Sequence, residues 1–179
     1  MKNVVLHVPN LKELWYREKC MTDPDTMSYN AGYDLSFEGY HYDTGCIEFP
    51  KSKHEEWLNN KNANPNFFFA YIEDVDTKEW VGYVNFKKNE KTKHATMGIV
   101  MESIHRGKGY MRPAMIELVK HAAESGVEVL TDTVPESREK ALKLFYDLGF
   151  EKTGQYVGTK FGKDEVIAEI EYIVNQRNK

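Results

Sequence analysis

The chain has 179 residues, of which 41% are hydrophobic, and its 24 Lys and Arg against 28 Asp and Glu give a formal net charge of −4. This length fits one globular domain, and the acidic balance without a basic block argues against partners such as nucleic acid or an anionic membrane surface. The longest apolar run, residues 67–72, is far shorter than the roughly 20 residues that cross a bilayer, and the N-terminus lacks the apolar centre of a secretory signal. We therefore expect a cytoplasmic protein.

The first third of the chain predicts short helices joined by turns. Residues 3–8 are β-prone, the apolar spacing after Pro9 is helical, and a second helical piece begins at Asp23. Residues 50–60 favour a surface helix. The intervening residues 29–49 are rich in Gly and Tyr, too irregular for a regular element and too aromatic for a disordered linker.

From residue 67 onward, the pattern predicts an alternation of strands and helices. Polar turns separate the first three strands, which favours an antiparallel meander, and the last two strands form a terminal hairpin. Gly149 follows the second helix as its expected stop. The predicted strands cover residues 67–72, 80–86, 94–101, 127–134, 150–159 and 166–174, and the predicted helices cover residues 114–122 and 141–148.

A basic turn with two glycines connects the third strand of the meander to the next helix. Gly107 and Gly109 would let the backbone approach a ligand. Arg106 and Lys108 add positive charge where the first N–H groups of a helix lack partners, which favours an anion such as phosphate. The dinucleotide fingerprint does not fit, because Arg112 stands where its third Gly belongs, and the nucleotide-triphosphate loop lacks its Gly and its hydroxyl. A purely structural turn stays an open alternative.

The turn Arg106-Gly-Lys-Gly-Tyr-Met111 resembles the acetyl-CoA pyrophosphate loop of GNAT-type N-acetyltransferases, whose pattern is Gln/Arg-x-x-Gly-x-Gly/Ala. Residues 141–150 resemble the family's Ala-x-x-Leu-Tyr-x-x-x-Gly-Phe helix and turn. The resemblance covers an acetyl-CoA-binding core at 67–174 and leaves 1–66 as a variable acceptor-side section of one domain, 1–179. It implies an α/β GNAT fold, with a mixed, mainly antiparallel central sheet and helices on both faces.

The resemblance also implies an activity, the transfer of an acetyl group from acetyl-CoA to a small-molecule or peptide amine by direct attack. It implies that the fourth and fifth strands splay, so that backbone groups can pair with the pantetheine arm. No metal is expected, because Cys20 and Cys46 are isolated thiols without ligand spacing. The implied cofactor contacts are Ile99, Val100, Met101, Arg106, Gly107, Lys108, Gly109, Tyr110, Met111 and Arg138.

Two positions depart from the family pattern and complicate the catalytic assignment. Phe145 stands at the position of the usual acid, a Tyr, and Arg138 at that of a common Asn. Tyr146 would act as the acid if the helix turned it toward the sulfur; otherwise the thiolate leaves without a side-chain acid. His94 and Glu102, at the two ends of one strand, are the candidate bases. The departures also keep open a non-catalytic acyl-CoA-binding or regulatory module, and a small-molecule binder forms a third alternative.

The acceptor side is expected in the aromatic N-terminal stretch. Tyr29, Tyr33, Tyr40 and Tyr42 are the candidate substrate-binding residues, and the alternative is that their rings pack a loop-rich section onto the sheet. The terminal hairpin could leave an edge strand for pairing, which would allow a homodimer. The sequence identifies neither the amine nor the oligomeric state.

Overall fold

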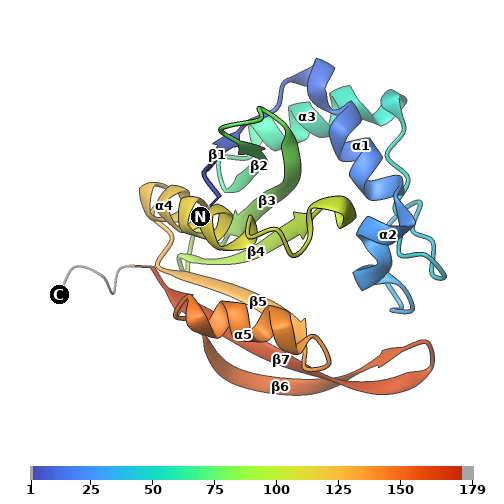
Figure 1. Cartoon of the computed structure of the whole chain (residues 1–179), viewed down its shortest axis with the longest axis vertical. Coiled ribbons are helices and arrows are strands. Elements are labelled where there is room, and N and C mark those ends of the chain that lie inside the picture. Colours follow the sequence, from blue (N-terminus) through green and yellow to red (C-terminus); the bar gives the residue numbers. More distant parts are fainter. Residues whose placement is uncertain (1, 175–179) are drawn as a thin grey trace.

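A computed structural model describes residues 2–174, and one seven-stranded sheet runs through it (Figure 1). The strands are β1 (Val4–His7), β2 (Phe67–Asp74), β3 (Trp80–Lys88), β4 (His94–Met101), β5 (Val129–Pro135), β6 (Glu151–Lys160) and β7 (Lys163–Ile173). Their order in the sheet is β1-β2-β3-β4-β5-β7-β6, and every neighbouring pair is antiparallel except β4 with β5. The mixed, mainly antiparallel sheet is confirmed.

Helices cover both faces of this sheet (Figure 1). The α-helices are α1 (Trp15–Thr22), α2 (Pro24–Met27), α3 (His54–Ala63), α4 (Met111–Glu124) and α5 (Glu139–Asp147), with 3-10 turns η1 (Leu11–Glu13), η2 (Ser28–Asn30), η3 (Lys51–Lys53) and η4 (Ser103–His105). Side chains of α4 and α5 pack on one face, and those of α1 and α3 on the other. Within residues 2–174, no helix is both long enough and apolar enough to cross a membrane.

Strand β2 shows why its sequence is a continuous apolar run. Ala70 and Ile72 belong to the core beneath α4 and α5, whereas Phe69 and Tyr71 belong to the core beneath α1 and α3. All four are buried. Successive side chains of a strand point to opposite faces, so a strand covered on both sides needs apolar residues at every position.

The first predicted helix begins later than expected. Asn10 caps η1 by accepting a hydrogen bond from the backbone N–H of Lys12, and Glu13 accepts one in return from the backbone of Asn10. This capping box starts a 3-10 turn, and the regular helix begins only at Trp15. At the other end of the chain, Gly149 follows α5 with φ +99°, as expected of a helix stop.

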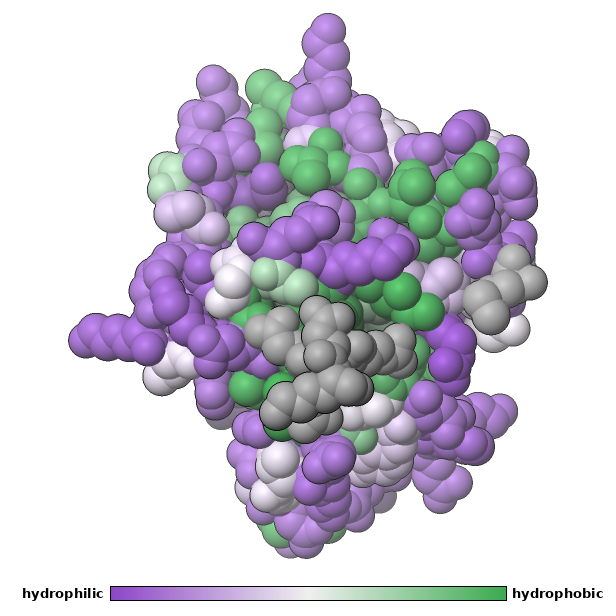
Figure 2. Space-filling model, turned by 90° about the vertical axis from the view of Figure 1, so that its left-hand side faces the viewer, coloured by the Kyte–Doolittle hydropathy of each residue, from purple (hydrophilic) through white to green (hydrophobic). Residues whose placement is uncertain are grey.

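The sheet ends at β1 on one side and at β6 on the other. Figure 2 shows the face that carries β1 and α4, where hydrophilic atoms predominate and apolar areas are separated by them. On β6, Tyr156 and Val157 are exposed. The terminal hairpin therefore does provide an edge strand, and the homodimer stays a prediction.

Candidate active site

Strands β4 and β5 separate after a short paired stretch. They pair at three positions only, from His94 with Val129 to Thr96 with Thr131. The remaining part of β4, up to Met101, pairs with β3 alone. The two strands diverge visibly in Figure 1. The expected splay is confirmed, and it leaves one backbone edge of β4 without a strand partner.

The loop between β4 and α4 has an open backbone. Gly107 and Gly109 adopt φ +72° and +86°, values at which a side chain is strained, and a Cβ added to either would meet nothing within 4 Å. Helix α4 begins at Met111, directly after the loop. A positively charged loop of this shape at a helix N-terminus suits the phosphates of acetyl-CoA.

The Arg106 side chain has a different place from the one expected. Its Nε and Nη1 donate to the backbone oxygens of Met101 and Asp25, at 3.2 and 3.0 Å, and its Nη2 donates to the oxygen of Thr26. Burial and the nearby Arg138 lower the pKa of Arg106. The guanidinium therefore fastens the loop to α2 and is not free to bind a phosphate in this arrangement.

Two further loop residues point away from that site. Tyr110 is buried, and its hydroxyl donates to Asp74 at 2.6 Å. Met111 packs against the core beneath α4. Lys108, in contrast, is exposed. The hydroxyl of Tyr110 is thus committed to a buried carboxylate, and the cofactor contacts expected of Tyr110 and Met111 stay a prediction.

Glu102 is buried at the end of β4 and is held by α1. One carboxylate oxygen accepts from the Tyr16 hydroxyl at 3.0 Å, and the other lies 2.5 Å from Lys19 Nζ. His105 Nε2 lies 3.9 Å away. The bond to Glu102 raises the pKa of Lys19. A carboxylate held in this way positions α1 against β4, and this geometry does not favour proton transfer from an acceptor.

The other two predicted proton carriers, His94 and Tyr146, are exposed. His94 is exposed at the paired end of β4, and seven residues of strand, about 23 Å, separate it from Met101. Helix α5 turns Phe145 inward, where it packs edge-on against Phe150 with ring centres 5.1 Å apart. Tyr146 is 40% exposed. The roles of His94 and Tyr146 in proton transfer stay predictions.

Asp132 was missed by the sequence analysis. It lies on β5 just after the last residue paired with β4, between the buried residues Leu130 and Val134. Its carboxylate accepts from the backbone N–H of Thr133 at 2.8 Å. Burial raises the pKa of Asp132 to about 7, while that N–H and the charge of Arg138 act in the opposite direction. A carboxyl group that titrates near neutrality beside a splay is suited to accept a proton.

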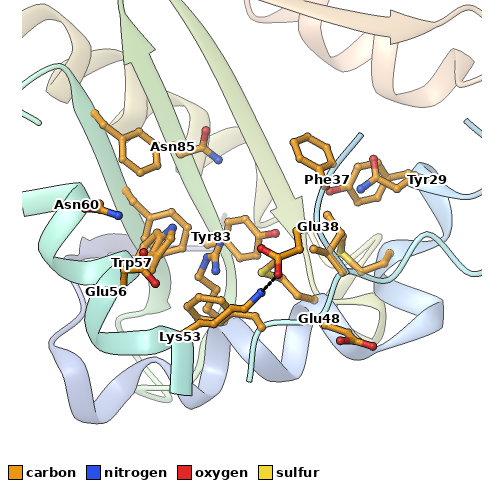
Figure 3. Close-up of a pocket in the computed structure, with 18 residues that line it drawn as sticks. Tyr29, Phe37, Glu38, Glu48, Lys53, Glu56, Trp57, Asn60, Tyr83 and Asn85 are labelled. Carbon is orange, nitrogen blue, oxygen red and sulfur yellow. Dashed lines mark ion pairs between the residues drawn. The ribbon is translucent and has the colours of Figure 1, made fainter. Parts of the chain in front are cut away.

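A pocket of about 570 Å³ opens on the face covered by α1 and α3 (Figure 3). Its sheet wall includes Tyr83 and Asn85, which pair with Val100 and Gly98 of β4. A Cβ added to Gly98 would lie 3.0 Å from the Asn85 amide nitrogen, so this glycine leaves room for the Asn85 side chain. The pocket is lined by Arg17, Met21, Met27, Tyr29, Asn30, Phe37, Glu38, Ile47, Glu48, Phe49, Lys53, Glu56, Trp57, Asn60, Phe67, Phe69, Tyr83 and Asn85.

Tyr29 connects this pocket with the splay. Its ring lines the pocket, and the Arg138 guanidinium carbon lies 5.8 Å from the ring centre. Burial raises the pKa of Tyr29, the positive charges of Arg138 and Arg106 lower it, and the charge of Asp132 adds to the rise. Residues from η2 and the start of α5 therefore meet at this end of the pocket.

The other three tyrosines of the aromatic stretch hold the loop in place. Tyr40 donates to the backbone oxygens of Asn30 and Tyr33, at 2.7 and 2.8 Å. Tyr33 donates to Glu165 of β7, and Tyr42 packs edge-on against Phe161. Among the four predicted substrate-binding residues, Tyr29 alone lines the pocket. For Tyr33, Tyr40 and Tyr42, the packing alternative fits the geometry better.

A family profile decides the identity of the fold. The profile described as "Acetyltransferase (GNAT) family" matches residues 31–150, which is most of the chain. The chain belongs to the GNAT acetyltransferase family. This GNAT protein is therefore an acetyl-CoA-dependent N-acetyltransferase, and the family match favours that enzyme over the non-catalytic module.

Solved GNAT structures resemble the protein over nearly its whole length. Spermidine N-acetyltransferase from Vibrio cholerae, in complex with CoA and spermine, has a TM-score of 0.80 at 17% identity and covers 97% of each chain. Ribosomal-protein-alanine N-acetyltransferase from Brucella melitensis has a TM-score of 0.72 at 18% identity, covering 94% of this chain and 99% of that one. A putative acetyltransferase from Salmonella typhimurium, with acetyl-CoA, has a TM-score of 0.73 at 14% identity, covering 98% and 96%. A search of curated protein sequences returns no significant match.

Proposed function

We propose that this N-acetyltransferase acts on a small-molecule or peptide primary amine that reaches the splay from the pocket side of the sheet. One observation carries this proposal. The pocket wall formed by Tyr83 and Asn85 is paired directly with Val100 and Gly98 of β4, the strand whose opposite edge borders the splay. An amine in this pocket and a thioester in the splay would thus meet at β4.

The chain's own residues suit acetyl-CoA. When bound, acetyl-CoA supplies a thioester whose carbonyl carbon bonds to the amine nitrogen while the C–S bond breaks. The open backbone at Gly107 and Gly109 supports a phosphate site there. The free edge of β4 supports backbone pairing of Ile99, Val100 and Met101 with the pantetheine arm.

Asp132 is the base that we propose for this reaction. Its position just beyond the β4–β5 pairing, next to the charges around Tyr29, supports this role. The amine nitrogen would lose its proton to the Asp132 carboxylate, and the departing thiolate would take a proton from solvent. Proton transfer of this kind typically contributes about 10²–10⁴-fold to a rate.

The cysteines support direct attack of the amine. Cys20 and Cys46 are both buried. Burial raises the pKa of Cys20 to about 12, so its thiol keeps its proton at neutral pH. A nucleophilic relay needs an accessible thiolate, which Cys20 does not offer.

Thiol release measured over a panel of amines tests the function. We expect free CoA to appear only when an acceptor is present, and Asp132→Asn to slow the release. Calorimetry with CoA provides the independent measurement of cofactor binding. The replacement of the usual Tyr by Phe145 is the one observation behind a second candidate, the non-catalytic module. CoA binding without acceptor-dependent thiol release over the whole panel would support that module and contradict the enzyme.

A cytoplasmic location and a homodimer through the edge strand β6 stay predictions from the sequence.

A further inference from the structure

One buried cation in the pocket has no anionic partner. Arg17 extends from α1 into the pocket, and its Nε and Nη1 atoms are buried without a hydrogen-bond partner within residues 2–174. Its guanidinium carbon lies 4.0 Å from the ring centre of Phe49 and 4.3 Å from that of Trp57. Both rings lie against the guanidinium, and His54 stacks on Phe49 with ring centres 4.6 Å apart.

Three carboxylates line the pocket, those of Glu38, Glu48 and Glu56, and none of them forms an ion pair with Arg17. Glu38 pairs with Lys53 at 2.8 Å, and Glu48 pairs with His41 at 3.1 Å (Figure 3 marks the first pair). No ion pair joins Arg17 to a carboxylate of the described residues. Burial lowers the pKa of Arg17, but a guanidinium keeps its charge in proteins.

A buried, oriented guanidinium with free N–H groups matches a carboxylate. Buried polar groups of native proteins nearly always have partners, and the planar fork of Arg binds both oxygens of a carboxylate. The pocket walls are largely apolar and aromatic, and they leave room for a ligand of a few residues' size. A polyamine has no group that would meet this guanidinium.

The position of Arg17 sets the separation between carboxylate and amine. The guanidinium lies above β2, with its carbon 5.7 Å from the Phe69 ring centre. The free edge of β4 is two strands away, or about 10 Å at the usual spacing of about 4.8 Å between strands. In a free α-amino acid, the α-amine and the carboxylate are attached to the same carbon. They lie too close together for the amine to reach β4 while Arg17 binds the carboxylate. The side-chain amine of lysine or the N-terminal amine of a short peptide can span most of that distance.

We propose that the acceptor is an amine that carries a carboxylate at the far end of its chain, as lysine and dipeptides do, and that Arg17 binds this carboxylate. The inference rests on the proposed function, because it names the substrate class of the same pocket.

Pairs of acceptors that differ only in the carboxylate test the inference. Lysine is compared with 1,5-diaminopentane, and glycyl-leucine with its C-terminal amide, in the thiol-release assay. We expect kcat/KM to be at least about tenfold higher for the carboxylate member, because charge-assisted bidentate binding is typically worth that factor or more. Arg17→Met should remove the preference mainly by raising KM, and Arg17→Lys should retain part of it. Lys120→Met, which removes an exposed cation on α4, should leave the preference for the carboxylate-bearing acceptor unchanged.

Calorimetry provides a measurement that does not depend on turnover. In the presence of CoA, lysine should bind with a Kd at least about tenfold lower than that of 1,5-diaminopentane. Equal binding of the two compounds, or a preference for the diamine, would overturn the inference even if transfer to amines is observed. Because both comparisons use the unmodified protein, they stand even if Arg17→Met does not fold. Failure of the proposed function would give a different result: CoA would bind, but neither the amines with a carboxylate nor those without one would cause the release of thiol.

Discussion

At the scale of single residues, Asp132 combines features that separate it from the other acidic groups of the sheet. It occupies an inward position of β5, where Leu130 and Val134 on either side are buried in the core. A carboxyl group in such a place prefers to stay protonated, and burial accordingly raises the pKa of Asp132 to about 7. A half-buried carboxyl group with a raised pKa beside the splay is a candidate proton acceptor.

Asp132→Asn should slow acetyl transfer by roughly 10²–10⁴-fold, the usual contribution of a general base. In the unmodified protein, the base works when ionised, so kcat/KM should rise with pH up to about 7 and then level off. The variant should lose this rise. Rates measured from pH 5.5 to pH 9 check the expectation, with CoA affinity by calorimetry as the control. An unchanged pH profile in the variant would assign the proton to another group.

The raised pKa of Asp132 also predicts how this residue affects the stability of the protein. Its pKa is raised from an ordinary 3.8 to about 7, so between these values the folded protein holds a proton that the unfolded chain has lost. The contribution of Asp132 to the free energy of unfolding therefore falls as pH rises from about 4 to 7 and is constant above 7.

Asp132→Asn should be more stable than the unmodified protein above pH 7, by an amount on the order of a few kcal/mol at most, and the difference should shrink toward pH 4. Urea unfolding at pH 4.5, 6 and 8 measures it. A difference that does not depend on pH would mean that the Asp132 pKa is not raised.

At the scale of elements, the backbone and the side chains of the β4–α4 loop serve different purposes: the side chains anchor the loop, and the backbone forms the predicted phosphate site. Arg106 places its side chain on α2, and Tyr110 places its own in the core. The two glycines at positive φ are what give the loop its shape. Binding of the cofactor phosphates should therefore depend on the loop backbone more than on its charged side chains.

Gly109→Ala should weaken CoA binding, and Gly126→Ala provides the matched control. Both glycines have positive φ, +86° and +71°, and a Cβ at either would meet nothing within 4 Å. Each substitution should cost about 1 kcal/mol of stability through backbone strain alone. Only Gly109 lies in the loop, so only its variant should raise the Kd for CoA in calorimetry. Equal affinities of the two variants would argue against a phosphate site in this loop.

The element pattern was predictable from sequence where a local signal existed. The apolar run of β2 and the helical spacing before Gly149 both gave elements close to those found. Asp132 also had a signal, because it alternates with Leu130 and Val134 and so had to face the core. Arg17 had no such signal in the sequence, because its burial depends on Phe49 and Trp57, which come from a loop and a helix more than 30 residues away. A pocket assembled from distant segments cannot be read from spacing within any one of them.

At the scale of the whole molecule, the N-terminal section is fastened to the core at several separate places. At one of them, the Tyr16 hydroxyl of α1 donates a hydrogen bond to the Glu102 carboxylate at the end of β4. At a second one, the backbone N–H of Phe161 in the β6–β7 turn donates a hydrogen bond to the backbone oxygen of Gly32 at 2.7 Å. A Cβ on Gly32 would lie 2.4 Å from the Phe161 ring, so the contact is close. The aromatic stretch is thus held against the last hairpin of the chain, and its Tyr29 is held at the pocket.

Phe161→Ala should loosen this second attachment without affecting the cofactor loop. The ring is half exposed and packs on Gly32 and Tyr42, so its loss should reduce stability by only about 1 kcal/mol. Hydrogen exchange should accelerate in residues 31–42, and KM for the amine should rise while the Kd for CoA stays the same. Val157→Ala is the control, because this side chain is exposed on the same hairpin. If Phe161→Ala raised the Kd for CoA as much as the KM for the amine, the hairpin would be supporting the cofactor side instead of the acceptor side.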